Sequence, residues 1–102
     1  MLETFTVHTF RPHLNDTFHV FPDAATDIPM TLITVTALGE GGTDTEPAQG
    51  RHPFSLVFRS APGVPLPQRI YTLEHAELGR FELFLVPIAA DREGVRYEAI
   101  FT

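Results

Sequence analysis

Apolar side chains recur at every second position through much of the chain, which is the spacing that turns one face of a β-strand toward a core. The clearest stretch runs from Pro29 to Leu38, where Ile33, Val35 and Ala37 share one face. β-branched residues dominate this stretch, and they fit a pleated surface better than a helix. We therefore predict a strand here.

The same alternation predicts five further strands. They are expected at residues 17–21, 53–60, 68–74, 80–87 and 95–102. Short connections favour antiparallel pairing, and the last three strands are expected to form a meander. Six short strands without a long helix indicate an all-β domain, either a small antiparallel β-barrel or a two-layer β-sandwich.

The first residues follow a different spacing. Apolar residues up to Leu14 lie three to five positions apart. Thr6 is placed to cap a short helical turn, and Pro12 restricts Arg11 and limits the length of that turn. We expect a short N-terminal helical turn ahead of the strands.

Two segments interrupt the strand pattern within the single domain expected for residues 1–102. Residues 39–52 hold three glycines in their first four positions and three acids among small polar residues, so we predict a mobile, acidic, Gly-rich loop. Residues 61–67 hold three prolines and a glycine. Proline at this density predicts a stiff, polyproline-like crossing.

The predicted strand 80–87 carries apolar side chains on both faces. Phe84 and Val86 lie opposite the apolar face that begins at Phe81, and they need cover from the N-terminal helical turn or from a partner protein. The final strand is a candidate sheet edge, where free backbone groups pair with another chain. The predicted interface consists of Phe84, Val86, Arg96, Glu98 and Ile100.

Composition and charge narrow the function classes. The chain of 102 residues is 43% hydrophobic, which suits one folded domain and not a disordered segment. No stretch approaches the ~20 apolar residues that cross a bilayer. The net charge of −6 argues against a nucleic-acid groove, because phosphate binding needs clustered positive charge. We expect neither nucleic acid nor membrane as a partner.

Two residue types that carry covalent chemistry are missing. The chain has no cysteine and no lysine, and all seven basic residues are arginines. Thiolate nucleophiles and side-chain Schiff bases are therefore excluded. The start of the chain has no basic run followed by an apolar run. We expect cytoplasmic synthesis without a signal peptide, with incorporation into an extracellular or virion-like assembly by another route.

No spacing of reactive side chains points to catalysis. The histidines contain no His-x-His and no i,i+4 pair. They are His8, His13, His19, His52 and His75. The chain has only two serines, Ser55 and Ser60, and neither lies in a nucleophile elbow. The acids are spread over loops and outward strand faces. We expect no enzymatic activity, no metal and no cofactor, although His13 and His19 flank a predicted turn and are placed to meet.

A spaced series of motifs adds a resemblance. It consists of Pro53-Phe-Ser-Leu-Val-Phe-Arg59, Pro65-Leu-Pro-Gln68, Tyr71-Thr-Leu-Glu-His75, Leu78-Gly79, Leu83-Phe-Leu-Val-Pro87 and Tyr97-Glu-Ala-Ile-Phe101, after Phe10-x-x-His13-Leu14. This series resembles a bacterial family of single-domain proteins of about this length and unknown function. Relatives of this kind are encoded near phage-tail-collar-like proteins, which implies a component or accessory of a tail-like or surface fibre.

We therefore expect a structural or assembly module that binds another protein, for example a tail-collar-like one, or a second copy of itself. The alternative is a small-ligand-binding β-barrel with Phe18, Tyr71 and Phe84 around its mouth. Against it, a closed barrel of this size is usually filled by its own side chains. The expected core is Phe54, Phe58, Tyr71, Phe81, Leu83, Leu85, Tyr97 and Phe101.

Overall fold

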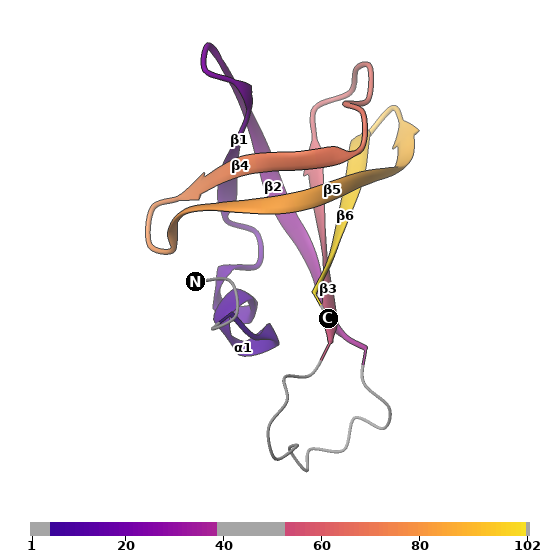
Figure 1. Ribbon diagram of the computed structural model, residues 1–102. Helices are drawn as coiled ribbons and strands as arrows, with labels where there is room; N and C mark the ends of the chain where they lie inside the picture. The colour runs from indigo at the N-terminus through magenta and orange to yellow at the C-terminus, as the bar shows by residue number, and fades with distance from the viewer. Residues whose placement is uncertain (1–4, 39–52, 102) are drawn as a thin grey trace.

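The structure is a computed structural model that describes residues 5–38 and 53–101. Two short helical turns precede six β-strands (Figure 1). The elements are α1 (Val7–Phe10), the 3₁₀ turn η2 (Arg11–His13), β1 (Thr17–Asp23), β2 (Thr26–Ala37), β3 (Phe54–Ser60), β4 (Arg69–His75), β5 (Gly79–Asp91) and β6 (Gly94–Phe101). The predicted loop at 39–52 lies outside the described residues. Neither helical turn in the described ranges has the length and apolar character needed to span a membrane.

The strands close into an antiparallel barrel in the order β1-β2-β3-β6-β5-β4, and β4 pairs back onto β1. This arrangement confirms the all-β prediction and the meander of the last three strands, and it selects the barrel over the sandwich. The prediction that the final strand is a sheet edge is wrong, because β6 pairs with β3 on one side and with β5 on the other. Closure uses the backbone groups that an edge would leave free.

Two strands run beyond their predicted ends. β2 begins at Thr26 instead of Pro29, and β5 continues to Asp91 instead of ending at Pro87. The register of β5 against β6 shifts between Pro87 and Ala89. This bulge accommodates a residue that cannot donate a ladder hydrogen bond. The connection between β5 and β6 is therefore a tight turn at Arg92 and Glu93.

Inward-facing side chains fill the barrel. The expected core residues are buried, except that Phe101 is half-buried and packs against the others. Tyr71 and Tyr97 are each 2% exposed, and both hydroxyls reach the β3–β4 connection. The Tyr97 hydroxyl accepts a hydrogen bond from the Leu66 N–H at 2.8 Å, and the Tyr71 hydroxyl donates to the Pro67 carbonyl at 2.5 Å. The core thereby holds the connection that crosses one end of the barrel.

The N-terminal helical turn begins where the sequence predicts. The Thr6 side chain accepts a hydrogen bond from the His8 N–H, and the Thr9 side chain accepts one from the Thr6 N–H. This reciprocal pair is a capping box, which satisfies donors that a helix start leaves open.

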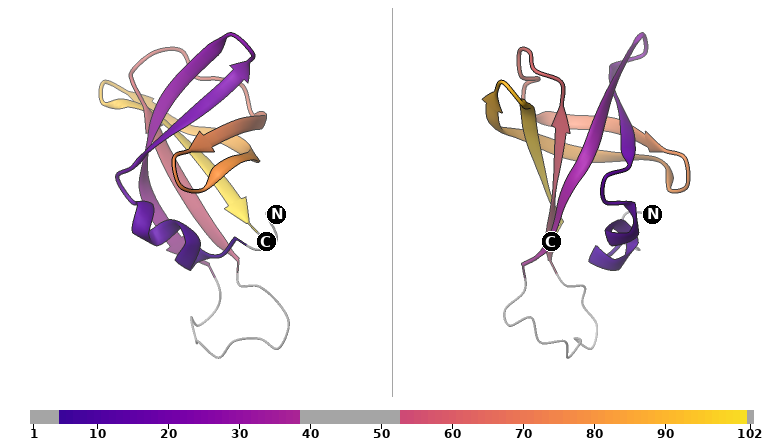
Figure 2. Two further views of the ribbon diagram at one scale, coloured as in Figure 1. Left: turned by 90° about the vertical axis from the view of Figure 1, so that its left-hand side faces the viewer. Right: turned by 180° about the vertical axis from the view of Figure 1, so that it is seen from behind.

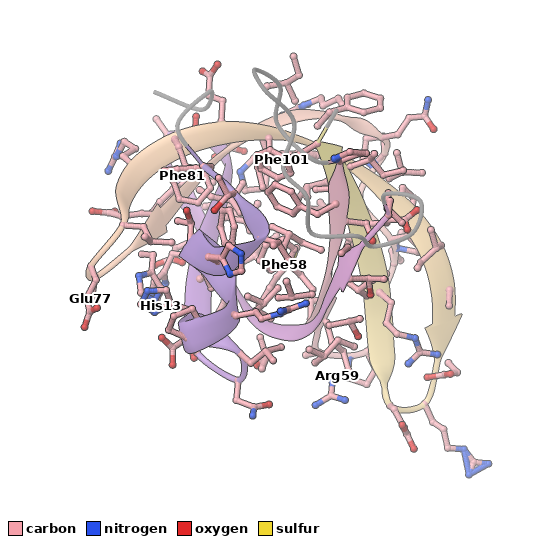
Figure 3. All side chains as sticks on the ribbon, turned by 90° about the horizontal axis from the view of Figure 1, so that it is seen from below. His13, Phe58, Arg59, Glu77, Phe81 and Phe101 are labelled. Atoms are coloured by element: carbon pink, nitrogen blue, oxygen red, sulfur yellow. The ribbon has the colours of Figure 1, made fainter. Side chains whose placement is uncertain are left out.

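The Phe10 side chain, which lies on α1, closes the other end of the barrel. Figure 3 shows this end from below. The Phe10 ring is fully buried, and ring centroids 5.7 to 6.4 Å away belong to Phe18, Phe54, Phe81 and Phe101. In both views of Figure 2, α1 lies below β4 and β5, level with the lower ends of β2 and β3. The prediction that this turn covers Phe84 is wrong, because Phe84 is 49% exposed on the outside of β5.

Candidate functional site

The five predicted interface residues face outward from two neighbouring strands. On β5, Phe84 and Val86 alternate with buried leucines. On β6, Arg96, Glu98 and Ile100 alternate with the buried face of that strand. The register sets Glu98 beside Val86 on the outer wall formed by β5 and β6, and Phe84 and Ile100 lie two positions beyond this pair on their strands.

Large hydrophobic residues are strongly exposed on each of three adjacent strands, and β5 carries a second one, Ile88, which is 49% exposed. Ile70 on β4 is 60% exposed, Phe84 on β5 is 49% exposed and Ile100 on β6 is 57% exposed. Ile70 is the cross-strand partner of Phe84, and it was missing from the predicted interface. The signal was present, because alternation places Ile70 opposite the inward Tyr71. We call Ile70, Phe84, Val86 and Ile100 the outer apolar strip.

Charged side chains border the outer apolar strip. Arg96 donates to Asp91 across 2.8 Å, which fixes the guanidinium group at the end of the wall. This hydrogen bond, followed by one from the Glu93 N–H, lowers the pKa of Asp91 below its ordinary value. Glu98 lies between Val86 of β5 and Val57 of β3. The wall therefore combines an apolar centre with a charged border, as protein-binding surfaces do.

A second cluster lies at the helix end of the barrel. Asp16 accepts two hydrogen bonds at the same oxygen, from His13 Nδ1 at 2.9 Å and from His75 Nε2 at 3.0 Å. The two imidazole rings meet edge to face with centroids 4.4 Å apart, and His13 Nε2 is 3.9 Å from Glu77 Oε1. We call His13, Asp16 and His75 the His–Asp–His cluster. Figure 3 shows His13 and Glu77 on the same side of the barrel end.

The His–Asp–His cluster was not predicted from the sequence, although one signal for it was available. His75 follows Tyr71 and Leu73 at a spacing of two, so the alternation of β4 turns its side chain inward, and it is 5% exposed. Its partner Asp16 lies 59 positions away in the chain. Sequence spacing therefore predicts a buried histidine but not its partners.

The hydrogen-bond pattern assigns one tautomer to His75. Its Nδ1 accepts backbone N–H groups from Glu77 at 3.0 Å and Leu78 at 3.2 Å. The ring proton therefore sits on Nε2, from which it is donated to Asp16. Donation from His75, and secondly from His13, stabilises the ionised carboxylate and lowers the pKa of Asp16 below its ordinary 3.8.

The His–Asp–His cluster has the residue types of a metal site, with ligand atoms within 4.8 Å of one another. The tautomer of His75 opposes that role. A metal-bound histidine ligates through one nitrogen and donates from the other, whereas His75 Nδ1 faces two N–H donors. The geometry instead ties the segment after η2 to the end of β4 through hydrogen bonds.

The other residues considered for chemistry lie apart. His19 pairs with Asp27 at 2.8 Å and not with His13, so the two histidines that flank the predicted turn do not meet. Glu74 points outward to Arg80 at 3.2 Å, on the face opposite His75.

A surface hollow of about 440 Å³ lies on the outer side of β1 and β4. Its lining consists of Phe21, Pro22, Asp23, Ala24, Arg69, Ile70, Thr72 and Arg80. The Arg69 guanidinium lies 4.7 Å from the Tyr71 ring centre and donates to the Pro22 carbonyl at 2.6 Å. The Arg80 guanidinium lies 5.3 Å from the Phe21 ring centre and pairs with Glu74. Both arginines therefore line the hollow while their guanidinium groups are held by neighbouring residues.

The three residues expected around a ligand-binding barrel mouth lie on two sides of the wall. Phe18 and Tyr71 are buried in the core, whereas Phe84 is outside. They therefore do not line a common cavity, and the hollow beside Ile70 is a different place.

Comparison with known proteins gives one match. A family model described as a domain of unknown function (DUF6916) matches residues 5–101, which is nearly the whole chain. This match agrees with the resemblance seen in the sequence, insofar as both point to a family of unknown function. No curated protein and no solved structure matches the chain significantly.

Proposed function

The chain belongs to the DUF6916 family, a domain of unknown function, and from this premise we propose that it is a non-enzymatic module that binds another protein through the outer apolar strip. The observation that carries this proposal is the exposure of Ile70, Phe84 and Ile100 on adjacent strands, between 49% and 60%. Removing such surface from water is favourable by about 25 cal/mol per Å². Contiguous apolar side chains on a folded surface mark sites of association.

The rigidity of the barrel supports this role. Closure of the sheet and the filled interior hold the strip in one shape, so little conformational entropy is lost when a partner binds. Because closure removes free strand edges, the partner is recognised by side chains and not by strand addition.

The setting that we propose is a phage-tail-like or surface fibre, with the chain as a component or an assembly accessory and a tail-collar-like protein as its partner. The support for this setting is the resemblance carried by the spaced motifs.

Co-expression with a tail-collar-like protein, followed by co-purification, tests the proposal. The double variant Phe84→Ser/Ile100→Ser is expected to lose the complex and to keep the melting temperature of the wild type. The control is Leu38→Ser, which changes a residue of similar exposure, 46%, after the end of β2 and outside the outer apolar strip. This control is expected to keep the complex.

Light scattering during size-exclusion chromatography separates the two kinds of partner. Self-association at micromolar concentration that the double variant abolishes would assign the strip to a second copy of the chain. A wild-type chain that stays monomeric and co-purifies with nothing would refute the proposal.

A second candidate function is the binding of a small anion with an apolar body in the hollow. The observation in its favour is the volume of about 440 Å³ beside Ile70, with Arg69 and Arg80 in the lining. Small-molecule sites have volumes of about 300–1,000 Å³. Benzoate is a suitable NMR probe: shifts at Ile70 and Thr72 that disappear in Arg69→Gln would support binding, and the absence of shifts at millimolar benzoate would exclude it.

A further inference from the structure

We propose that the β3–β4 connection, residues 61–67, is a preformed recognition loop that fits an aromatic-lined groove of the kind that reads proline-rich segments. The sequence of the loop is Ala-Pro-Gly-Val-Pro-Leu-Pro, without a polar side chain. The inference rests on the proposed function in assuming a protein partner. It uses a surface separate from the outer apolar strip, so each can fail without the other.

The sequence of the loop restricts its backbone. Three prolines fix φ near −65°. They are Pro62, Pro65 and Pro67. The residue before each proline is pushed toward extended or polyproline II geometry. Only Gly63 escapes both restrictions, and residues 64–67 form two consecutive X-Pro units, the repeat that proline-reading grooves accept.

The barrel anchors the second half of the loop. The Leu66 N–H donates to the Tyr97 hydroxyl at 2.8 Å, and the Pro67 carbonyl accepts from the Tyr71 hydroxyl at 2.5 Å. Both tyrosines belong to the core and are 2% exposed, so the anchors are rigid. A partner that binds this loop therefore loses little affinity to ordering it.

The first half of the loop is exposed to solvent. Residues 61–65 are all exposed, and Val64 is 91% exposed. The loop projects from the end of the barrel opposite α1 (Figure 1). Connections of this kind are normally rich in polar residues, and neither the core nor the barrel closure requires a valine that makes so little contact. An apolar ridge of fixed shape is complementary to a groove of aromatic rings, which pack against proline and valine side chains.

Binding to purified proline-reading domains tests the fit. The probes are one SH3-type and one WW-type domain, each with tryptophan in its groove. Because the chain contains no tryptophan, any change in tryptophan emission reports the groove of the probe. With the labelled chain, we expect saturable NMR shifts centred on the amides of Gly63, Val64 and Leu66.

Matched variants separate the loop from the strip. Val64→Ser and Pro65→Ala are each expected to weaken binding by about tenfold, the loss of one buried apolar side chain. Phe84→Ser is expected to leave this binding unchanged. If neither probe binds at millimolar concentration, or if Phe84→Ser abolishes binding while Val64→Ser does not, the inference is overturned. The complex with a tail-collar-like protein remains the separate measure of the proposed function.

NMR relaxation of the free chain tests the preformed shape. The Val64 and Leu66 amides are expected to have order parameters near those of the strands, about 0.85, and values below about 0.6 would show that the loop is not preformed. Tyr97→Phe removes the anchor of Leu66. It is expected to lower the order parameter there and to weaken binding, provided that the melting curve shows a folded chain.

Discussion

The substitution Phe10→Ala gives the most direct measure of how the N-terminal helical turn contributes to the fold. Phe10 is fully buried, although it lies on a helical turn of four residues that touches the barrel only at one end. A turn this short has little stability of its own. The position of α1 must therefore depend on the packing of this ring.

The expected magnitude follows from the contacts of the Phe10 side chain. Its ring faces the rings of Phe5, Phe18, Phe54, Phe81 and Phe101. Truncation of a fully buried phenylalanine lowers the free energy of unfolding by about 3–5 kcal/mol. A small domain has about 5–15 kcal/mol in total. At about 4–8 °C per kcal/mol, the melting temperature is expected to fall by about 12 °C or more.

Urea unfolding followed by far-UV circular dichroism measures this loss. The matched control is Phe84→Ala, which removes the same atoms from a side chain that is 49% exposed on the outer wall. We expect the control to cost about 1 kcal/mol or less. The slope of the free energy against urea is expected to stay unchanged in both variants, because both unfold from the same compact state.

Equal losses for Phe10→Ala and Phe84→Ala would refute the reasoning. That result would mean that α1 detaches from the barrel without disturbing the core, and the aromatic contacts of Phe10 would then carry no net free energy. A change in slope for Phe10→Ala alone would mean that the end of the barrel opens before the rest unfolds.

Three further predictions concern polar contacts and backbone geometry. NMR correlation of ring protons and nitrogens is expected to place the His75 proton on Nε2, and a proton on Nδ1 would contradict the assigned tautomer. His75→Phe is expected to lower the free energy of unfolding by at least about 2 kcal/mol, because two backbone N–H groups lose their acceptor. The folded-state pKa of Asp16 lies below 3.8. The contribution of Asp16 to stability is therefore complete above the unfolded-state pKa and is lost as the pH falls through the folded-state pKa. Asp16→Asn is expected to flatten the pH dependence of the free energy of urea unfolding in that range, and an unchanged profile would contradict this. Gly94→Ala would place a Cβ 2.1 Å from the Ser60 carbonyl oxygen at φ +137°, and it is expected to lower the free energy of unfolding by more than about 2 kcal/mol. Gly79→Ala, at φ +84° in open space, is expected to lower it by about 1–2 kcal/mol. Calorimetry measures both losses, and equal losses would argue against the clash.

The predicted strands and the inward faces of β1, β3, β4, β5 and β6 agree with the structure because alternation is a local property. The face predicted for β2 is wrong: Met30 and Leu32 are buried, whereas Ile33 is not, and a bulge between Leu32 and Thr34 interrupts the alternation. Leu83 and Leu85 are buried and Phe84 is exposed, as the spacing of two requires. The Thr6 cap was also predictable, since the capping residue and its helical turn are neighbours in the chain. Strand ends were less predictable, because the bulge after Pro87 depends on the strand beside it.

The candidate site was predictable in part. Phe84 and Ile100 were expected to face outward, and they do. Ile70 was on the correct face in the pattern, but its place beside Phe84 depends on the register of β4 against β5. The contacts of His75 with Asp16 were not predictable, because 59 positions separate the two residues.

The amino-acid sequence by itself determined where the strands lie to within a few residues and, except in β2, which side chains face the core, because these properties depend on near neighbours in the chain. Only the tertiary structure decided that the sheet closes through β1 and β4, that α1 covers an end of the barrel and not its wall, and that His13, Asp16 and His75 meet. Such contacts join distant parts of the chain. Their loop-closure entropy is offset only when the whole core assembles, so no local pattern encodes them.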